Sequence, residues 1–118
     1  MYSGETKVVV GCDLVHISRF VKTLERTPSV REKLFVLEEM STECTMEHLA
    51  GIFAAKEALI KALSWKAGCW HDIIVHKRDD GRPVYRLVTG QSNILSHDLS
   101  ISHDGDYALA FCSLTLKQ

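Results

Sequence analysis

The chain has 118 residues, of which 46% are hydrophobic and 25% are charged, a size and composition that predict one compact domain over residues 1–118. Fourteen Lys and Arg residues against fifteen Asp and Glu residues give a formal net charge of -1, which excludes the strongly basic surface of a nucleic-acid-binding protein. No apolar run approaches the roughly 20 residues that span a bilayer, and the first residues lack a signal-peptide pattern, so we expect a cytoplasmic protein without a membrane partner.

The N-terminal region predicts a strand followed by a helix. Residues 7–13 form a β-branched run that ends at Asp13, which is typical of a buried strand. Residues 17–26 have apolar side chains at helical spacing, which predicts a short amphipathic helix. The outer face of this helix is basic and carries Arg19, Lys22 and Arg26.

A second helix is predicted after Pro28, which ends the first one. The Ser29-x-x-Glu32 pattern is that of a capping box, so we expect this helix to begin at Ser29 and to run towards Met40. The polar residues that follow, 41–45, predict a break in the helical structure.

The strongest pattern in the chain predicts a long helix over residues 46–63, with Thr45 as its N-cap. One stripe of this helix is apolar and carries Leu49, Phe53, Ile60 and Leu63. The neighbouring stripe is first small and then charged, with Ala50, Ala54, Glu57 and Lys61. Lys56 falls on the apolar stripe, where we expect its stem to be covered and its ammonium group to reach solvent.

The rest of the chain predicts two hairpins. Residues 72–78 form a strand closed by the turn 79–81, and Pro83 begins the return strand, which extends to residue 88. After a polar link, strands at 99–103 and 107–116 are joined by a second turn. The order of strand, helices and hairpins predicts an α+β fold: an antiparallel sheet with one long central helix and short helices.

The cysteines and histidines show no metal-binding pattern. The four cysteines lie far apart in the chain, so no two have the spacing of a zinc knuckle or of a redox CxxC pair. We expect them to be reduced and mostly buried. There is no HExxH motif either, so the sequence does not support a zinc site.

Three residues of this pattern could form a phosphate-handling site. Glu57 and Lys61 lie four positions apart and project from one face of the predicted helix, although an ordinary exposed salt bridge explains the same spacing. Asp13 could join Glu57 in binding a hard cation such as Mg²⁺, with Lys61 directed at phosphates. The alternative for Asp13 is a turn or capping residue, and His103, beside a tight turn, is typical of a histidine bonded to the backbone.

Four ordered segments resemble a known enzyme family. They are Gly11-Cys12-Asp13, the helical motif Phe53-Ala54-Ala55-Lys56-Glu57 continued to Lys61, the turn Asp80-Gly81-Arg82-Pro83, and Ser100-Ile101-Ser102-His103. Together they resemble the holo-(acyl carrier protein) synthase type of 4′-phosphopantetheinyl transferase over nearly the whole chain. A single Lys-Glu-x-x-x-Lys motif would be a weak signal, and the resemblance depends on all four segments.

The resemblance implies an activity and its catalytic residues. Members transfer the 4′-phosphopantetheine arm of coenzyme A to a serine of an apo acyl carrier protein and release adenosine 3′,5′-bisphosphate. By this resemblance Asp13 and Glu57 hold Mg²⁺ against the coenzyme A pyrophosphate, and Lys61 binds the phosphates and shares in catalysis. Whether water at the metal or one of the carboxylates accepts the serine proton stays open.

The resemblance also implies binding residues and an assembly. The positions that match those near the coenzyme are Lys61, Gly81, Pro83, Ser102 and His103. Family members form trimers with sites between neighbouring subunits, so a homotrimer is expected. The basic residues Arg19, Lys22 and Arg26 match the helix that engages an acidic carrier protein, and a solvated helix face is the alternative.

The chain departs from the family pattern at four positions. Ile52 stands where members often carry an arginine, so one contact to a coenzyme A phosphate is missing. Trp65 and Trp70 replace small residues in a shortened loop near the expected path of the pantetheine arm. His16 replaces a residue that is commonly acidic. Coenzyme A affinity and the choice between fatty-acid and secondary-metabolite carrier proteins are therefore open.

Two other interpretations compete with the enzyme. The first is a noncatalytic homologue of the same fold that binds a carrier protein or regulates it. Retention of Asp13, Glu57 and Lys61 argues against this interpretation, because a scaffold needs none of them. The second is another phosphate-handling enzyme, but the chain has neither a P-loop nor a Gly-x-Gly-x-x-Gly motif.

Overall fold

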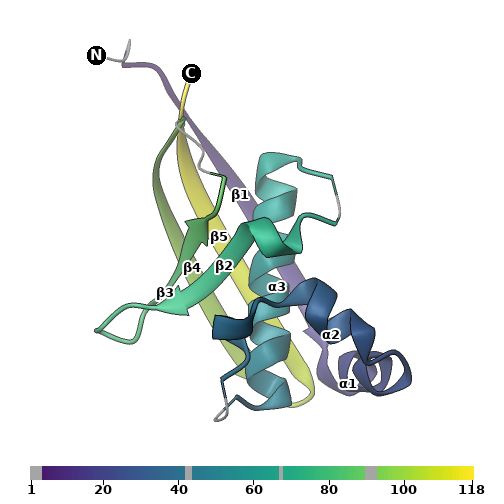
Figure 1. Ribbon diagram of the computed structural model, residues 1–118. Coiled ribbons are helices and arrows are strands. Elements are labelled where there is room, and N and C mark those ends of the chain that lie inside the picture. Colours follow the sequence, from purple (N-terminus) through teal and green to yellow (C-terminus); the bar gives the residue numbers. More distant parts are fainter. Residues whose placement is uncertain (1–3, 42–43, 67, 90–92) are drawn as a thin grey trace.

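The computed structural model describes residues 4–41, 44–66, 68–89 and 93–118. The helices are α1 (Ile17–Arg26), α2 (Ser29–Leu34) and α3 (Met46–Leu63), with the short 3₁₀ helices η1 (Leu37–Glu39) and η2 (Trp70–Asp72). The strands are β1 (Thr6–His16), β2 (Ile73–Lys77), β3 (Pro83–Leu87), β4 (Ile94–Asp104) and β5 (Tyr107–Lys117). Figure 1 shows α3 along one face of the long strands, with α1 and α2 gathered near one of its ends.

The strands form two antiparallel sheets. The larger has the order β1-β5-β4, and its β1–β5 pairing is continuous from Thr6 opposite Lys117 to His16 opposite Tyr107. The smaller pairs β2 with β3 around the predicted turn, where Gly81 has a φ of +87°. The α+β fold with a long central helix is thus confirmed, and the predicted sheet is divided in two.

The contact between α3 and β1 positions the strand very close to the helix. A Cβ atom at Gly11 would lie 1.8 Å from the carbonyl oxygen of Ala58, so only glycine fits at this point of the strand. The alanines on the facing side of α3, Ala50, Ala54 and Ala58, are fully buried. These small residues therefore accommodate the close approach of the sheet.

The predictions for the second helix were partly wrong. The helix begins at Ser29, but it ends at Leu34, and Phe35 has an extended backbone and is 1% exposed. The reason is that Phe35 enters the core, while the Leu34 carbonyl accepts a hydrogen bond from Lys56 Nζ at 2.6 Å in place of a further helical turn. The capping box is absent as well, because Pro28 is the N-cap and makes no side-chain hydrogen bond.

The prediction that the first strand ends at Asp13 was wrong. Strand β1 continues to His16 because the ladder with β5 continues without interruption. His16 is instead the N-cap of α1, and its Nδ1 accepts a hydrogen bond from the backbone N–H of Arg19 at 3.2 Å. The capping role that had been the alternative for Asp13 therefore belongs to His16. The predicted α1 and α3, with Thr45 capping α3, are confirmed.

The cysteines are free but not mostly buried, so that expectation was wrong. Cys112 is buried, Cys44 and Cys69 are half-buried, and Cys12 is exposed. Cys12 is exposed because it lies on the face of the sheet turned away from α3, opposite Phe111 of β5. In the part of the chain that the structure describes, no helix is long and apolar enough to cross a bilayer.

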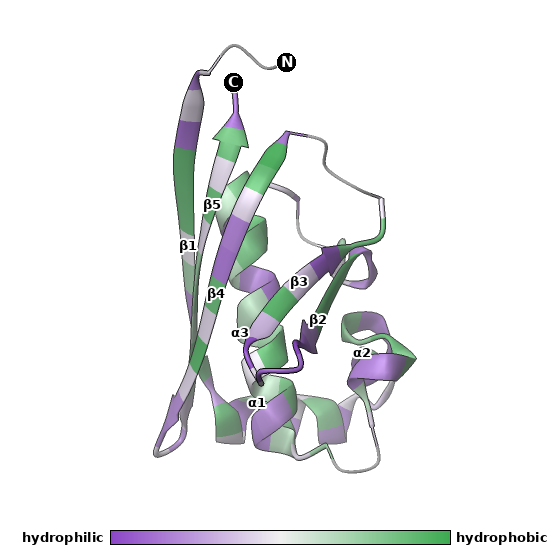
Figure 2. Cartoon of the chain, turned by 90° about the vertical axis from the view of Figure 1, so that its left-hand side faces the viewer, coloured by the Kyte–Doolittle hydropathy of each residue, from purple (hydrophilic) through white to green (hydrophobic). Residues whose placement is uncertain are grey.

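The face of the β1-β5-β4 sheet turned away from α3 is apolar and exposed. Alternation and register place on it Val8, Val10, Leu14, Leu109 and Phe111, each 40% to 62% exposed. Figure 2 shows the apolar stretches along these strands from the open side of the sheet. An apolar face of this kind is typical of a protein that is covered by another chain.

Candidate active site

Asp13 and Glu57 line the same cavity, although they come from different elements. The cavity measures about 490 Å³ and lies between the end of β1, α1 and α3, with Arg19 and Phe53 also in its wall. Asp13 faces α3 because it alternates with the outward-facing Cys12 and Leu14. The close approach at Gly11 then places this carboxylate beside the helix that carries Glu57.

Lys61 forms an ion pair with Asp13. Its Nζ donates to Asp13 Oδ1 at 2.9 Å and to the Cys12 carbonyl at 3.1 Å. The ammonium group is accessible, since the Lys61 side chain is 55% exposed and that of Asp13 is 17% exposed. The hydrogen bond to Asp13, together with the charges of Asp13 and Glu57, raises the pKa of Lys61 above its ordinary value. Lys61 is therefore a permanent cation at the edge of the site.

Glu57 is held by a tryptophan rather than by Lys61. The indole Nε1 of Trp70, in η2, donates to Glu57 Oε1 at 2.8 Å. The i,i+4 salt bridge that had been the alternative for Glu57 and Lys61 is not formed, because Lys61 turns towards Asp13. The two residues thus contribute separately to the site.

The donor set suits a hard divalent cation. Within the described ranges, Asp13 and Glu57 each have one carboxylate oxygen in a hydrogen bond and the other without one. The described residues contain no cluster of three His, Cys, Asp or Glu side chains that could bind a metal by itself. Mg²⁺ is typically bound by one or two carboxylates, and water and phosphate oxygens occupy its other coordination positions.

Lys56 does not reach solvent, contrary to the expectation. It is 0% exposed, and its Nζ donates to Glu39 Oε1 at 2.6 Å, to the Leu34 carbonyl at 2.6 Å and to the Trp70 carbonyl at 2.9 Å. Burial lowers the pKa of Lys56, and the hydrogen bond and charge of Glu39 oppose this shift. Lys56 therefore links α2, η1 and η2 to α3.

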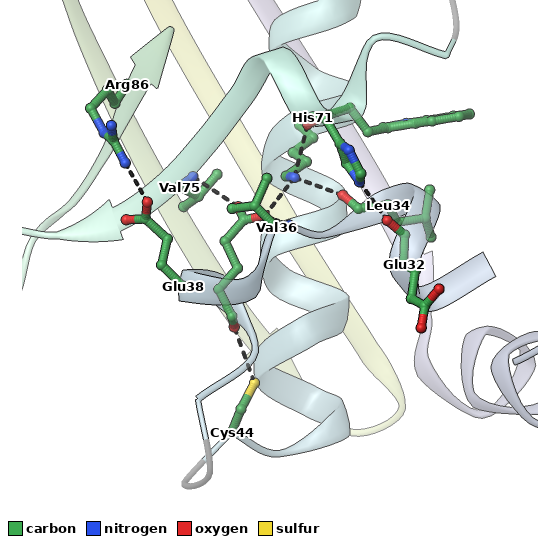
Figure 3. A network of polar contacts seen from close by, with 11 residues as sticks. Glu32, Leu34, Val36, Glu38, Cys44, His71, Val75 and Arg86 are labelled. Atoms are coloured by element: carbon green, nitrogen blue, oxygen red, sulfur yellow. Dashed lines mark hydrogen bonds and ion pairs between the residues drawn. The ribbon is translucent and has the colours of Figure 1, made fainter. Parts of the chain in front are cut away.

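Glu39 completes this buried network, which Figure 3 shows from close by. Its Oε1 also accepts from the Val36 N–H and its Oε2 from the Val75 N–H, each at 2.9 Å. The buried carboxylate thus has three hydrogen-bond donors and joins η1 to β2. At the periphery of the same network, Glu38 pairs with Arg86, and His71 contacts the carbonyl of Glu32.

A second cavity contains most of the residues that had been assigned to the coenzyme. It measures about 660 Å³, and its wall includes Gly81, Pro83, His103 and Ile52. His103 Nε2 lies 3.1 Å from the Glu47 carbonyl, the backbone contact that had been expected of this histidine. Ser102 alternates with His103 along β4 and lies on the outer face of the sheet, opposite Leu109. One chain therefore does not bring all the predicted binding residues together, and Asp13 and Glu57 line a different cavity.

The basic residues of α1 are exposed along one side of that helix. Arg19 lines the cavity of Asp13 and Glu57, whereas Lys22 and Arg26 lie further along the helix surface. Beside them, His16 Nε2 lies 3.2 Å from Asp106 Oδ2, which joins the start of α1 to the β4–β5 turn.

Sequence reasoning missed two structural roles near the site. Trp70 had been noted only as a departure from the family pattern. No sequence pattern around it predicts the contact with Glu57, which lies on another element. Lys56 had been singled out for its position among apolar residues, but its partner Glu39 lies on another element. Trp65 packs at the margin of the core, and Ile52, which also lines the second cavity, is 4% exposed.

Comparison with known proteins identifies relatives of this chain. A family model described as the 4′-phosphopantetheinyl transferase superfamily matches residues 9–112. The holo-[acyl-carrier-protein] synthase of Micrococcus luteus is 42% identical over 113 residues, covering 88% of this chain and 88% of the relative. The protein of the same name from Frankia casuarinae is 40% identical over 110 residues, covering 87% and 92% respectively.

Solved structures give the same result. An ACPS–CoA complex from Chronobacterium ammoniagenes superposes with a TM-score of 0.82 at 38% identity, covering 95% of this chain and 99% of that one. The holo-[acyl-carrier-protein] synthase of Helicobacter pylori in complex with coenzyme A gives a TM-score of 0.80 at 30% identity, covering 89% and 98% respectively.

Proposed function

The chain belongs to the 4′-phosphopantetheinyl transferase superfamily, and from this premise we propose that it is a holo-(acyl carrier protein) synthase. It transfers the 4′-phosphopantetheine group of coenzyme A to a serine of an apo acyl carrier protein. The observation that carries the proposal is that Asp13 and Glu57, distant in the sequence, line one cavity with Lys61 bound at its edge. We also propose that residues 1–118 form a single domain of this type, and its cytoplasmic location stays a prediction.

The reaction forms one bond and breaks one bond. The serine hydroxyl oxygen forms a bond to the phosphorus that carries the pantetheine arm. The bond from that phosphorus to the bridging oxygen breaks, and adenosine 3′,5′-bisphosphate leaves with the electron pair. The serine proton passes to a carboxylate of the cavity or to water.

Asp13 and Glu57 would hold Mg²⁺ through the carboxylate oxygens that have no hydrogen bond from the described residues. When bound, Mg²⁺ would neutralise the negative charge that develops on the phosphate oxygens. Lys61 is charged and accessible, so it can leave Asp13 for a phosphate oxygen and stabilise the same charge. Arg19, with Lys22 and Arg26, would attract an acidic carrier protein towards this cavity.

We further propose that the active assembly is a homotrimer with sites between subunits. The apolar outer face of the β1-β5-β4 sheet supports an interface between copies, since its large side chains are exposed in the single chain. Ser102 lies on that face, whereas Gly81, Pro83 and His103 line the second cavity. An interface between copies would bring the coenzyme-binding residues of one subunit to the carboxylates of the next.

Intact-mass analysis of an apo carrier protein tests the transfer. Incubation with this protein, coenzyme A and Mg²⁺ should add one phosphopantetheine group, and a chelator, Asp13→Ala or Glu57→Ala should abolish the gain. Asp79→Ala, which removes an exposed carboxylate outside both cavities and away from the outer face of the β1-β5-β4 sheet, is the matched control and should retain the activity. No mass gain across several carrier proteins would support the noncatalytic carrier-binding homologue instead.

Light scattering of the purified protein tests the assembly. We expect a mass three times that of the chain, and Leu109→Asp, which puts a charge on the apolar face, should yield monomers without transfer activity. Monomers of the unchanged protein that retain full activity would contradict the shared site.

A further inference from the structure

Trp70 is held from both ends by two consecutive residues of α3. Its carbonyl oxygen accepts a hydrogen bond from Lys56 Nζ at 2.9 Å, and its indole N–H donates to Glu57 Oε1 at 2.8 Å. Lys56 is itself fully buried and bound to Glu39. The tryptophan therefore connects a buried network to one carboxylate of the candidate site.

The contact has a direct consequence for Glu57. A free glutamate on a helix can rotate about its terminal bonds and present either oxygen or both to a ligand. With Oε1 occupied by the indole, Oε2 is the oxygen without a hydrogen bond from the described residues. An indole N–H can only donate, so it keeps Oε1 as an acceptor and holds the carboxylate in this orientation.

We propose that Trp70 is a positioning residue, which orients the Glu57 carboxylate so that Oε2 alone binds the divalent cation. This inference is based on the proposed function, because it assigns to Trp70 a role towards the metal that Asp13 and Glu57 would hold. Groups that orient a metal ligand by hydrogen bonding typically change metal affinity by about 10–100-fold.

The chain offers a matched pair of variants. Trp70→Phe retains an aromatic ring and the backbone carbonyl that Lys56 binds, but it loses the N–H donor. Trp65→Phe makes the same substitution at the other tryptophan, whose side chain makes no hydrogen bond within the described residues. Thermal unfolding verifies that both variants fold.

Mn²⁺ serves as the probe, and the electron paramagnetic resonance signal of the free ion reports its binding to the assembled protein. We expect Trp70→Phe to weaken Mn²⁺ binding about ten-fold and Trp65→Phe to leave it within two-fold of the unchanged protein. A folded Trp70→Phe variant with unchanged Mn²⁺ affinity would overturn the proposal.

A second measurement does not require any change at Trp70. In Trp65→Phe the only indole is Trp70, so saturable Mn²⁺ binding next to Glu57 should quench its fluorescence with the dissociation constant found by resonance. Emission that does not respond to saturating Mn²⁺ would also overturn the proposal.

Glu57→Gln separates the two hypotheses. If Glu57→Gln weakens Mn²⁺ binding and Trp70→Phe does not, the positioning role fails while the proposed function stands. If neither Glu57→Gln nor Asp13→Asn changes Mn²⁺ binding, the metal site of the proposed function fails.

Discussion

Two lysines on α3, five residues apart, form ion pairs with carboxylates from other elements, and they differ in almost every other respect. Lys56 and Glu39 are both 0% exposed in their side chains and are separated by 2.6 Å. Lys61 and Asp13 are separated by 2.9 Å, and their side chains are 55% and 17% exposed. Their pKa values also shift in opposite directions, since burial lowers the pKa of Lys56 whereas the hydrogen bond to Asp13 raises that of Lys61.

The buried pair maintains the fold, and the exposed pair is available to bind a ligand. Each partner of the buried pair has further hydrogen bonds to the backbone, so neither can exchange its partner without leaving a polar group unsatisfied. The exposed pair lies beside solvent, where water or a phosphate oxygen can replace Asp13 as the partner of Lys61 at low cost. The same Lys-Glu-x-x-x-Lys motif thus contains one buried structural lysine and one accessible lysine, to which we assign the proposed phosphate contact.

The largest effect should follow from Lys56→Met. It leaves the Glu39 carboxylate and two backbone carbonyls buried without their cation, so the free energy of unfolding should fall by about 3 kcal/mol. Denaturant titration measures it, with Lys61→Met as the control, which should cost less than about 1 kcal/mol. Equal losses in the two variants would remove the distinction between the pairs.

Lys61→Met should instead reduce the reaction rate. Loss of one positioned charge donor at a phosphoryl-transfer site costs about 10²–10³ in rate, and we expect kcat to fall by about 100-fold at saturating coenzyme A. Steady-state kinetics with an apo carrier protein provide the measurement. An unchanged kcat in Lys61→Met would exclude a contribution of Lys61 to the reaction rate.

Arg19→Glu tests a third charged residue, which lines the cavity of Asp13 and Glu57. Reversal of this charge should raise the KM for the carrier protein about ten-fold, because an acidic partner is then repelled. The KM for coenzyme A should change far less, and Lys7→Glu, a reversal on β1, controls for the altered net charge. Similar increases in both KM values would exclude Arg19 from the docking surface.

The smallest effect concerns pH. Because the folded-state pKa of Lys61 is raised above its value in the unfolded chain, near 10.4, its pair with Asp13 stabilises the fold fully below that value. This contribution is lost as pH rises through the folded-state pKa. The small stability difference between the unchanged protein and Lys61→Met at pH 8 should therefore shrink as the pH rises above about 10.4. A difference that stays constant would show that methionine acts through packing alone.

Much of the fold was predictable because its signals are local. The helices at 17–26 and 46–63 follow from apolar spacing with clear ends, and the turns follow from Asp-Gly and Pro. The early end of α2 was not predictable, because it depends on Phe35 entering the core and on Lys56 binding the Leu34 carbonyl. Both causes are contacts with residues distant in the sequence, so the residues around position 34 contain no signal for them.

The site, like the fold, was predictable where the signals are local and not where they depend on long-range contacts. Asp13, Glu57 and Lys61 could be selected from residue type and order, and the structure brings them together. The contact of Trp70 with Glu57 and the pairing of Lys56 with Glu39 depend on elements that meet only in the folded chain. Ser102 could not be assigned to a face from its motif, because that requires the register of β4 with β5.

The missing side chain at position 11 has a consequence for how such a site can diversify. Main-chain atoms of β1 and α3 are in direct contact there, so the distance between strand and helix is the thickness of two polypeptide backbones. Backbone dimensions do not vary with amino-acid type. The separation of β1, which carries Asp13, from α3, which carries Glu57, is therefore set at this point by the main chain, and side chains around the cavity can be substituted without changing it.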